Sequence, residues 1–141
     1  MNDQVFAPVR RATLLIPGTG PAHDPARAHL FVILTDPCPN GMVLVVPVCR
    51  AVRGYDNTCI LGAGDHPFFK QKSYVAYYRL QTYSAAELID KEEKQIIRFR
   101  GMLDEKVFAL ICNGVEQSRL SAPVHKHYFA AQTPKRPETS R

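Results

Sequence analysis

The sequence predicts a mainly β fold, a small antiparallel barrel that is packed by a C-terminal helix. Five short apolar runs come first along the chain, and no helical pattern separates them. Two of these runs, at residues 30–34 and 42–46, are continuously apolar, so we expect central strands that are covered on both faces. Near the C-terminus, apolar residues recur at helical spacing and supply the helix that covers the barrel.

The expected strands are short and are separated by turns rich in glycine and proline. An irregular loop of this composition spans residues 17–25, after the first strand. A turn that ends in Asn40-Gly41 precedes the third strand, as in tight hairpins. The five strands are expected at residues 12–16, 30–34, 42–46, 58–61 and 73–78.

The second half of the chain is expected to hold two helices with a further strand, residues 96–99, between them. Ser84 and Glu87 match a capping box, which predicts a short helix that ends near residue 89. Asp104 is expected to cap a longer helix that ends near residue 117. The apolar stripe of this helix consists of Val107, Leu110, Ile111 and Val115.

Length and composition place the chain among globular proteins. The 141 residues suffice for one domain with its own core, which we expect over residues 1–131, before a disordered basic tail over residues 132–141. The contents of 45% hydrophobic and 22% charged residues exclude a disordered or coiled-coil protein. No apolar run is long enough to cross a membrane, and the first residues lack a signal-peptide pattern, so we expect a cytoplasmic location.

The net charge of +5 permits binding to the phosphates of nucleic acids without requiring it. The four cysteines form no C-x-x-C pair, which argues against a structural zinc site. The sequence also contains no phosphate-binding loop, no zinc-protease motif and no serine-hydrolase motif. We therefore expect neither a metal nor a cofactor.

Polar and charged side chains stand among the predicted strands and form the candidate site. His29 comes directly before an apolar strand, and Arg50 comes directly after one. The turn at residues 64–68 contains His66. The residues that follow this turn add Lys70, Lys72, Ser73 and Tyr77.

Two of these residues also have a structural interpretation. His66 can instead cap its own turn, and Tyr77 can be a core aromatic residue with a hydrogen-bonded hydroxyl. On a strand that begins at Ser73, residues 73, 75 and 77 share one face, so Ser73 and Tyr77 are expected to point the same way.

The segment GMVLVVPVCR at residues 41–50, followed by Arg53-Gly54-Tyr55, resembles the central strand and following loop of the MazF/PemK-like toxin family. The first strand, its Gly/Pro loop and the segment HLFVILTDP at residues 29–37 resemble the opening of the same family. The resemblance covers about residues 10–80. The family pattern has an arginine where this sequence has His29, and a hydroxyl residue where it has Cys49 and Arg50.

This resemblance implies an SH3-like barrel of the MazF/PemK/CcdB-like kind that forms a homodimer. It also implies a toxin-like endoribonuclease, the toxin of a toxin–antitoxin pair, which cleaves single-stranded RNA without a metal. The expected partners are then RNA, an antitoxin protein and a second copy of the chain.

Metal-free RNA cleavage needs a base, an acid and a cation at the phosphate, and the candidate residues offer these groups. We expect His29 to act as acid or base, with His66 as the second proton-transfer group. Arg50 is expected to bind the phosphate, and Ser73 to donate a hydrogen bond. The residues expected to bind substrate are Arg53, Lys70 and Lys72, along the RNA backbone, and Tyr55 and Tyr77, as faces for base stacking.

Two other interpretations of the same residues stay open. One is a non-catalytic barrel that binds nucleic acid or a protein partner, with the catalytic groups lost. The other is a structural or assembly module in which the basic residues form a solvated face.

Overall fold

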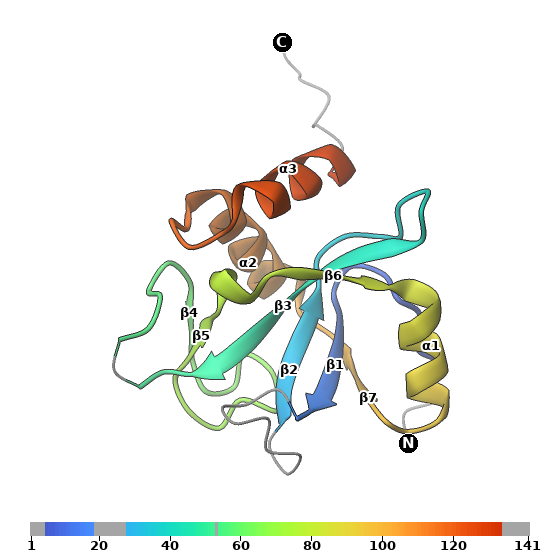
Figure 1. Cartoon of the computed structure of the whole chain (residues 1–141). Helices are drawn as coiled ribbons and strands as arrows, with labels where there is room; N and C mark the ends of the chain where they lie inside the picture. The colour runs from blue at the N-terminus through green and yellow to red at the C-terminus, as the bar shows by residue number, and fades with distance from the viewer. Residues whose placement is uncertain (1–4, 19–27, 53, 134–141) are drawn as a thin grey trace.

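The computed structural model describes residues 5–18, 28–52 and 54–133. Strands predominate in the first half of this chain, and helices gather toward its C-terminal end (Figure 1). In chain order the elements are β1 (Ala12–Pro17), β2 (Ala28–Ile33), β3 (Met42–Arg50), β4 (Ile60–Leu61), β5 (Ser73–Val75), the 3-10 helix η2 (Tyr77–Arg79), β6 (Gln81–Ser84), α1 (Ala85–Glu93), β7 (Arg98–Met102), α2 (Glu105–Gln117) and α3 (Pro123–Gln132).

The seven strands form one antiparallel sheet in the order β4-β5-β3-β2-β1-β7, and β6 pairs with β3 beside this path. The strand β3 is long enough to serve two partners. Its first residues, from Met42 to Val45, pair with β6, and its last, from Val48 to Arg50, pair with β5. Pro47 lies between the two ladders, at a place where a residue without an N–H is tolerated.

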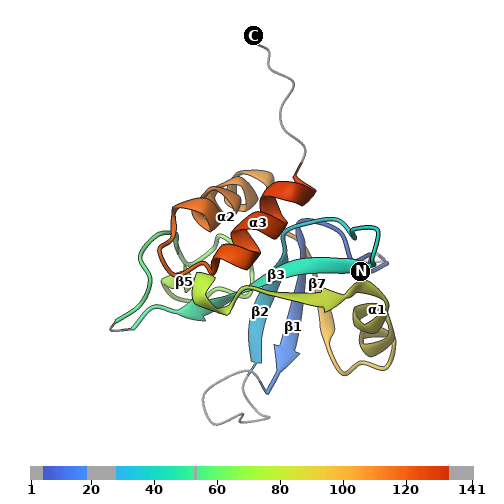
Figure 2. The same cartoon turned by 45° about the horizontal axis from the view of Figure 1, so that its top comes forward.

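The central strands are buried on both faces, as their unbroken apolar runs predicted. Alternate residues of β2 and β3 enter two separate cores. In β2, Leu30 and Val32 face the core that α2 completes, whereas Phe31 and Ile33 face the core completed by α1. Both views show α2 and α3 together on one side of the sheet and α1 apart from them (Figure 2).

Both predicted helix starts are confirmed by their capping hydrogen bonds. The Ser84 side chain accepts from the Glu87 N–H, and the Asp104 side chain accepts from the N–H groups of Lys106 and Val107. The helix α1 continues to Glu93, beyond the expected end. In the described part of the chain, no helix is both long enough and apolar enough to cross a membrane.

The expected antiparallel sheet is present as an open sheet, whose strand order ends at β4 and β7. Finer expectations for single elements need correction. The strand expected over residues 73–78 stops at Val75, where η2 takes over. Within the α2 stripe, Leu110 is 56% exposed, and Phe108 packs into the core instead.

Two elements, β6 and α3, were not predicted. Residue 132, which was assigned to the tail, is the last residue of α3. Residues 134–141 of the expected tail lie outside the described residues, as do residues 19–25 of the expected Gly/Pro loop.

A basic pocket as the candidate functional site

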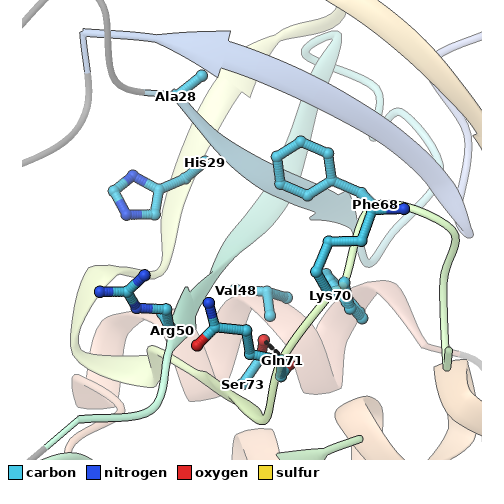
Figure 3. A pocket seen from close by; sticks show the side chains of 9 residues that line it. Ala28, His29, Val48, Arg50, Phe68, Lys70, Gln71 and Ser73 are labelled. Carbon is cyan, nitrogen blue, oxygen red and sulfur yellow. Dashed lines mark hydrogen bonds between the residues drawn. The ribbon is translucent and has the colours of Figure 1, made fainter. Parts of the chain in front are cut away.

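A pocket of about 350 Å³ opens where β2, β3 and β5 meet the segment between β4 and β5 (Figure 3). Its position follows from the sheet register, because Arg50 at the end of β3 pairs with Ser73 at the start of β5. The lining residues are Ala28, His29, Val48, Arg50, Phe68, Phe69, Lys70, Gln71 and Ser73.

His29 and Arg50, which are 21 positions apart in the numbering of the chain, both line this pocket. Figure 3 shows the imidazole and the guanidinium projecting to the same side, from β2 and β3 respectively. Each residue lies at the end of its strand that is nearer the pocket, which is where a side chain leaves the core and meets solvent. The sequence expectation that these two groups share one site is consistent with this placement.

The pocket is basic. Lys70 comes from the segment between β4 and β5 and stands on the side opposite His29 in Figure 3. The lining residues thus include three nitrogen-bearing basic side chains and no carboxylate. Phe68 adds an apolar wall. Such a combination attracts an anion, and guanidinium and ammonium groups both suit a phosphate.

Ser73 lines the pocket, but its hydroxyl has a local role. The Oγ atom donates a hydrogen bond to the backbone oxygen of Gln71 at 3.0 Å. The side chain is also buried. Because the hydroxyl proton is used within the turn, Ser73 shapes the pocket floor and does not offer the substrate the donor that we expected.

His66 does not line the pocket and is only 5% exposed. Its Nδ1 accepts a hydrogen bond from the Phe68 N–H at 3.0 Å, so Nε2 carries the proton of the neutral ring. Nε2 lies 3.1 Å from the Arg100 backbone oxygen and 3.3 Å from Thr13 Oγ1. Thr13 Oγ1 donates its own proton to the Gly101 oxygen, so it accepts from His66.

This network assigns His66 a structural role. It caps its turn and joins the segment after β4 to β1 and β7, at the opposite end of the strand order. Burial lowers the pKa of the imidazole and keeps it neutral. The expectation of a second proton-transfer group at His66 is therefore replaced by its structural alternative.

Tyr77 belongs to the core and cannot stack with a base. Its side chain is 0% exposed, and its hydroxyl donates to the Ile111 backbone oxygen in α2 at 2.7 Å. The chain leaves the strand after Val75 and enters η2, but Val75 and Tyr77 still pack into the same core, the one that α2 completes, whereas Tyr74 and Ala76 pack elsewhere.

Tyr55 and Lys72 come together outside the pocket. The Tyr55 ring stacks on Tyr74, with centroids 5.2 Å apart and an interplanar angle of 26°. The Lys72 Nζ atom lies 5.9 Å from the Tyr55 ring centroid. Arg53, the remaining expected substrate-binding residue, lies outside the described residues.

Sequence reasoning missed Gln71 in the pocket and Tyr74 beside it. The alternation of strand residues contained a signal for Tyr74, since residues 74, 76 and 78 lie on the face opposite Ser73 in an extended chain. Among the described residues, no three His, Cys, Asp or Glu side chains gather as a metal site requires.

No protein-family model matches the chain, and no curated protein matches it. The resemblance to the MazF/PemK-like family therefore depends on the sequence segments quoted above.

Proposed function

We propose that the basic pocket binds a phosphate of single-stranded RNA and that His29 and Arg50 promote cleavage of the RNA chain. The observation that carries this proposal is the shared pocket of His29, Arg50 and Lys70, in which none of the lining residues that the structure describes is a carboxylate that would repel a phosphate. An RNA backbone supplies both a phosphate and an adjacent 2′-hydroxyl, the nucleophile needed for cleavage.

In the proposed reaction, the neutral His29 imidazole takes the proton of the 2′-hydroxyl. The 2′-oxygen then attacks phosphorus while the bond from phosphorus to the 5′-oxygen breaks. The Arg50 guanidinium binds the phosphoryl oxygens, whose negative charge grows in the transition state. The flexible Lys70 side chain supplies a proton to the departing 5′-oxygen. The products are a 2′,3′-cyclic phosphate and a 5′-hydroxyl.

The family resemblance adds further parts to the proposal. These are closure of the sheet into an SH3-like barrel, assembly as a homodimer, an antitoxin protein as partner and a cytoplasmic location. The link from the segment after β4 to β1 and β7 through His66 is the observation that supports closure.

The test is cleavage of a labelled single-stranded RNA by the purified chain in the presence of EDTA. We expect His29→Ala and Arg50→Ala each to lower the cleavage rate on the order of 100-fold. A substrate with 2′-deoxy sugars should bind and stay intact, since it lacks the nucleophile.

Lys91→Ala is the control, because it also removes an exposed positive charge but lies in α1, away from the pocket. Cleavage that is equally fast in the His29→Ala protein would contradict the proposed reaction. Each variant's circular dichroism should match the parent protein, which separates lost chemistry from lost folding.

A second function, RNA binding without cleavage, is favoured by the placement of His66 and Ser73. With His66 buried and the Ser73 hydroxyl committed to Gln71, His29 is the one imidazole among the residues that line the pocket. Fluorescence anisotropy separates the two functions. Binding that Arg50→Ala weakens, with no cyclic phosphate product under any condition, would favour this second function over the first.

A further inference from the structure

Three tyrosines gather on the face of β3 and β5 that is opposite to the basic pocket and form what we call the tyrosine platform, defined as Tyr55, Tyr74 and Tyr78. Tyr55 stacks on Tyr74, and the hydroxyls of Tyr74 and Tyr78 lie 3.5 Å apart. Tyr78 is 55% exposed, whereas Tyr74 is only 8% exposed. Tyr74 thus supports its two neighbours; Tyr55 is half-buried, and Tyr78 presents the exposed ring of the platform.

The platform adjoins the pocket across the end of one strand pair. Arg50 pairs with Ser73 on the pocket side, and the preceding pair, Cys49 with Tyr74, points to the other face. Lys72 stands at the boundary, because its Nζ atom lies over the Tyr55 ring and its residue directly precedes Ser73. Lys72 thus marks the route by which a flexible chain from the pocket would turn around the end of these two strands toward the platform.

The segment that carries Tyr55 is fixed in place. The neighbouring Asp56 carboxylate accepts hydrogen bonds from Thr58 Oγ1 and from Ser118 Oγ, both at 2.6 Å. Ser118 follows the end of α2, so the loop is anchored to the helical layer. On the other side, the Ala51 N–H donates to the Lys72 backbone oxygen at 3.0 Å. A fixed aromatic surface binds a flat ligand with little loss of side-chain freedom.

We propose that the tyrosine platform binds the base of a nucleotide next to the one whose phosphate occupies the pocket. This inference rests on the proposed function of that pocket. It identifies the tyrosine platform as the subsite that makes the protein prefer RNA with unpaired bases. Aromatic faces accept any base by stacking, and a nearby cation follows the sugar-phosphate backbone. Lys72 and Arg50 are the cations in this position. A base held in a duplex cannot expose its face in this way.

The experiment measures binding of two uncleavable oligomers of equal length by fluorescence anisotropy. One is 2′-O-methyl oligouridine, and the other is the same 2′-O-methyl sugar-phosphate chain without bases. We expect the parent protein to bind the base-containing oligomer about tenfold more tightly, which is the effect of one stacked base.

Tyr78→Ala should remove most of this difference, and Tyr78→Phe should keep it, because stacking needs the ring and not the hydroxyl. Leu110→Ala is the matched control, since Leu110 is equally exposed but lies on α2. The control should bind both oligomers as the parent protein does.

The outcomes distinguish the platform from the pocket. Equal affinity of the parent protein for both oligomers, with both weakened by Arg50→Ala, would overturn the platform and leave the proposed function in place. A base-dependent difference that Tyr78→Ala removes, with no effect of Arg50→Ala, would support the platform and count against the pocket. Failure to bind either oligomer would overturn both.

Discussion

At the scale of single residues, Gly114 of α2 packs directly against Tyr77. A Cβ atom at position 114 would lie 1.9 Å from the Tyr77 hydroxyl oxygen and 2.4 Å from its Cζ atom. The Tyr77 ring is fully buried and its hydroxyl bonds to α2, so the ring has no room to move away. Glycine at this place is therefore required by the close approach of the helix to the ring.

Gly114→Ala should destabilise the protein, although alanine is the better helix former by about 1 kcal/mol. The overlap with a fixed core ring outweighs this gain, and we expect a net loss of about 1–3 kcal/mol in the free energy of unfolding. Urea denaturation measures the change. The exposed neighbour Asn113→Ala tests helix propensity alone and should be neutral or slightly stabilising. A Gly114→Ala protein as stable as the parent would show that the Tyr77 ring can shift to make room for the methyl group.

A site residue's role could be predicted from the sequence only where no nearby backbone group takes up its hydrogen bonds. The positions of His29 and Arg50 could be predicted, because both stand at strand ends where side chains leave the core. Ser73 was placed correctly at the start of its strand and His66 in its turn, but their roles were not predicted. Each has a backbone partner within two residues, Gln71 and Phe68 respectively, and short local hydrogen bonds of this kind are not visible in strand periodicity.

At the scale of elements, the segment between β4 and β5 builds one wall of the pocket and is held by the buried His66. Its neutral ring accepts at Nδ1 from Phe68, inside the wall itself, and donates at Nε2 to Arg100 of β7. A proton added at Nδ1 would face the Phe68 N–H, donor against donor. The wall and the sheet are thus joined by a group that must stay neutral.

We expect the stability of the protein to fall below about pH 6.5, the ordinary pKa of histidine. Burial lowers the pKa of His66 in the folded state, so the unfolded chain binds the proton first. The contribution of the neutral His66 ring to the free energy of unfolding is complete above the ordinary pKa of histidine. It is lost as the pH falls through the lowered pKa of His66 in the folded state. Melting temperatures measured from about pH 7 to about pH 5 should drop more steeply for the parent protein than for His66→Gln.

The other four histidines are the same in both proteins, so the comparison isolates His66. Parallel pH profiles for the two proteins would show that His66 is not the group responsible.

The elements that sequence reasoning found are those with strong local signals, such as the apolar central strands and the two capped helices. The strand β6, Gln81–Ser84, has a polar sequence and is held by its ladder to the first half of β3, a long-range partner. In α3 none of the residues is fully buried, so no apolar stripe marks it. The signal that could have found α3 is Pro123, because proline is favoured in the first turn of a helix.

At the scale of the whole molecule, the net charge of +5 attracts phosphates in general. The proposed function requires that the cations of the pocket contribute to RNA binding more than the other basic residues do. Binding of single-stranded RNA releases counterions, so the logarithm of the affinity should fall linearly with the logarithm of the salt concentration. Arg50→Ala should lower the magnitude of this slope by about 0.7, the value for one phosphate contact on a single strand. Anisotropy titrations over a range of salt concentrations measure it.

Lys91→Ala should leave the slope unchanged, as its charge lies on α1. An equal reduction in both variants would mean that the general field of the protein, and not the pocket, attracts the RNA.

The junction at His66 also bears on the order in which the molecule assembles. It joins positions 53 residues apart, at Thr13, and 34 apart, at Arg100, whereas β1, β2 and β3 pair as successive neighbours. Closing long loops costs entropy and slows pairing, so we expect this junction to form after the rate-limiting step of folding. A variant that lacks the hydrogen bonds of His66 would then unfold faster, with a folding rate nearly unchanged. Because the same segment brings Phe68 and Lys70 to the pocket, the proposed RNA site would be among the last parts to appear and the first to come apart.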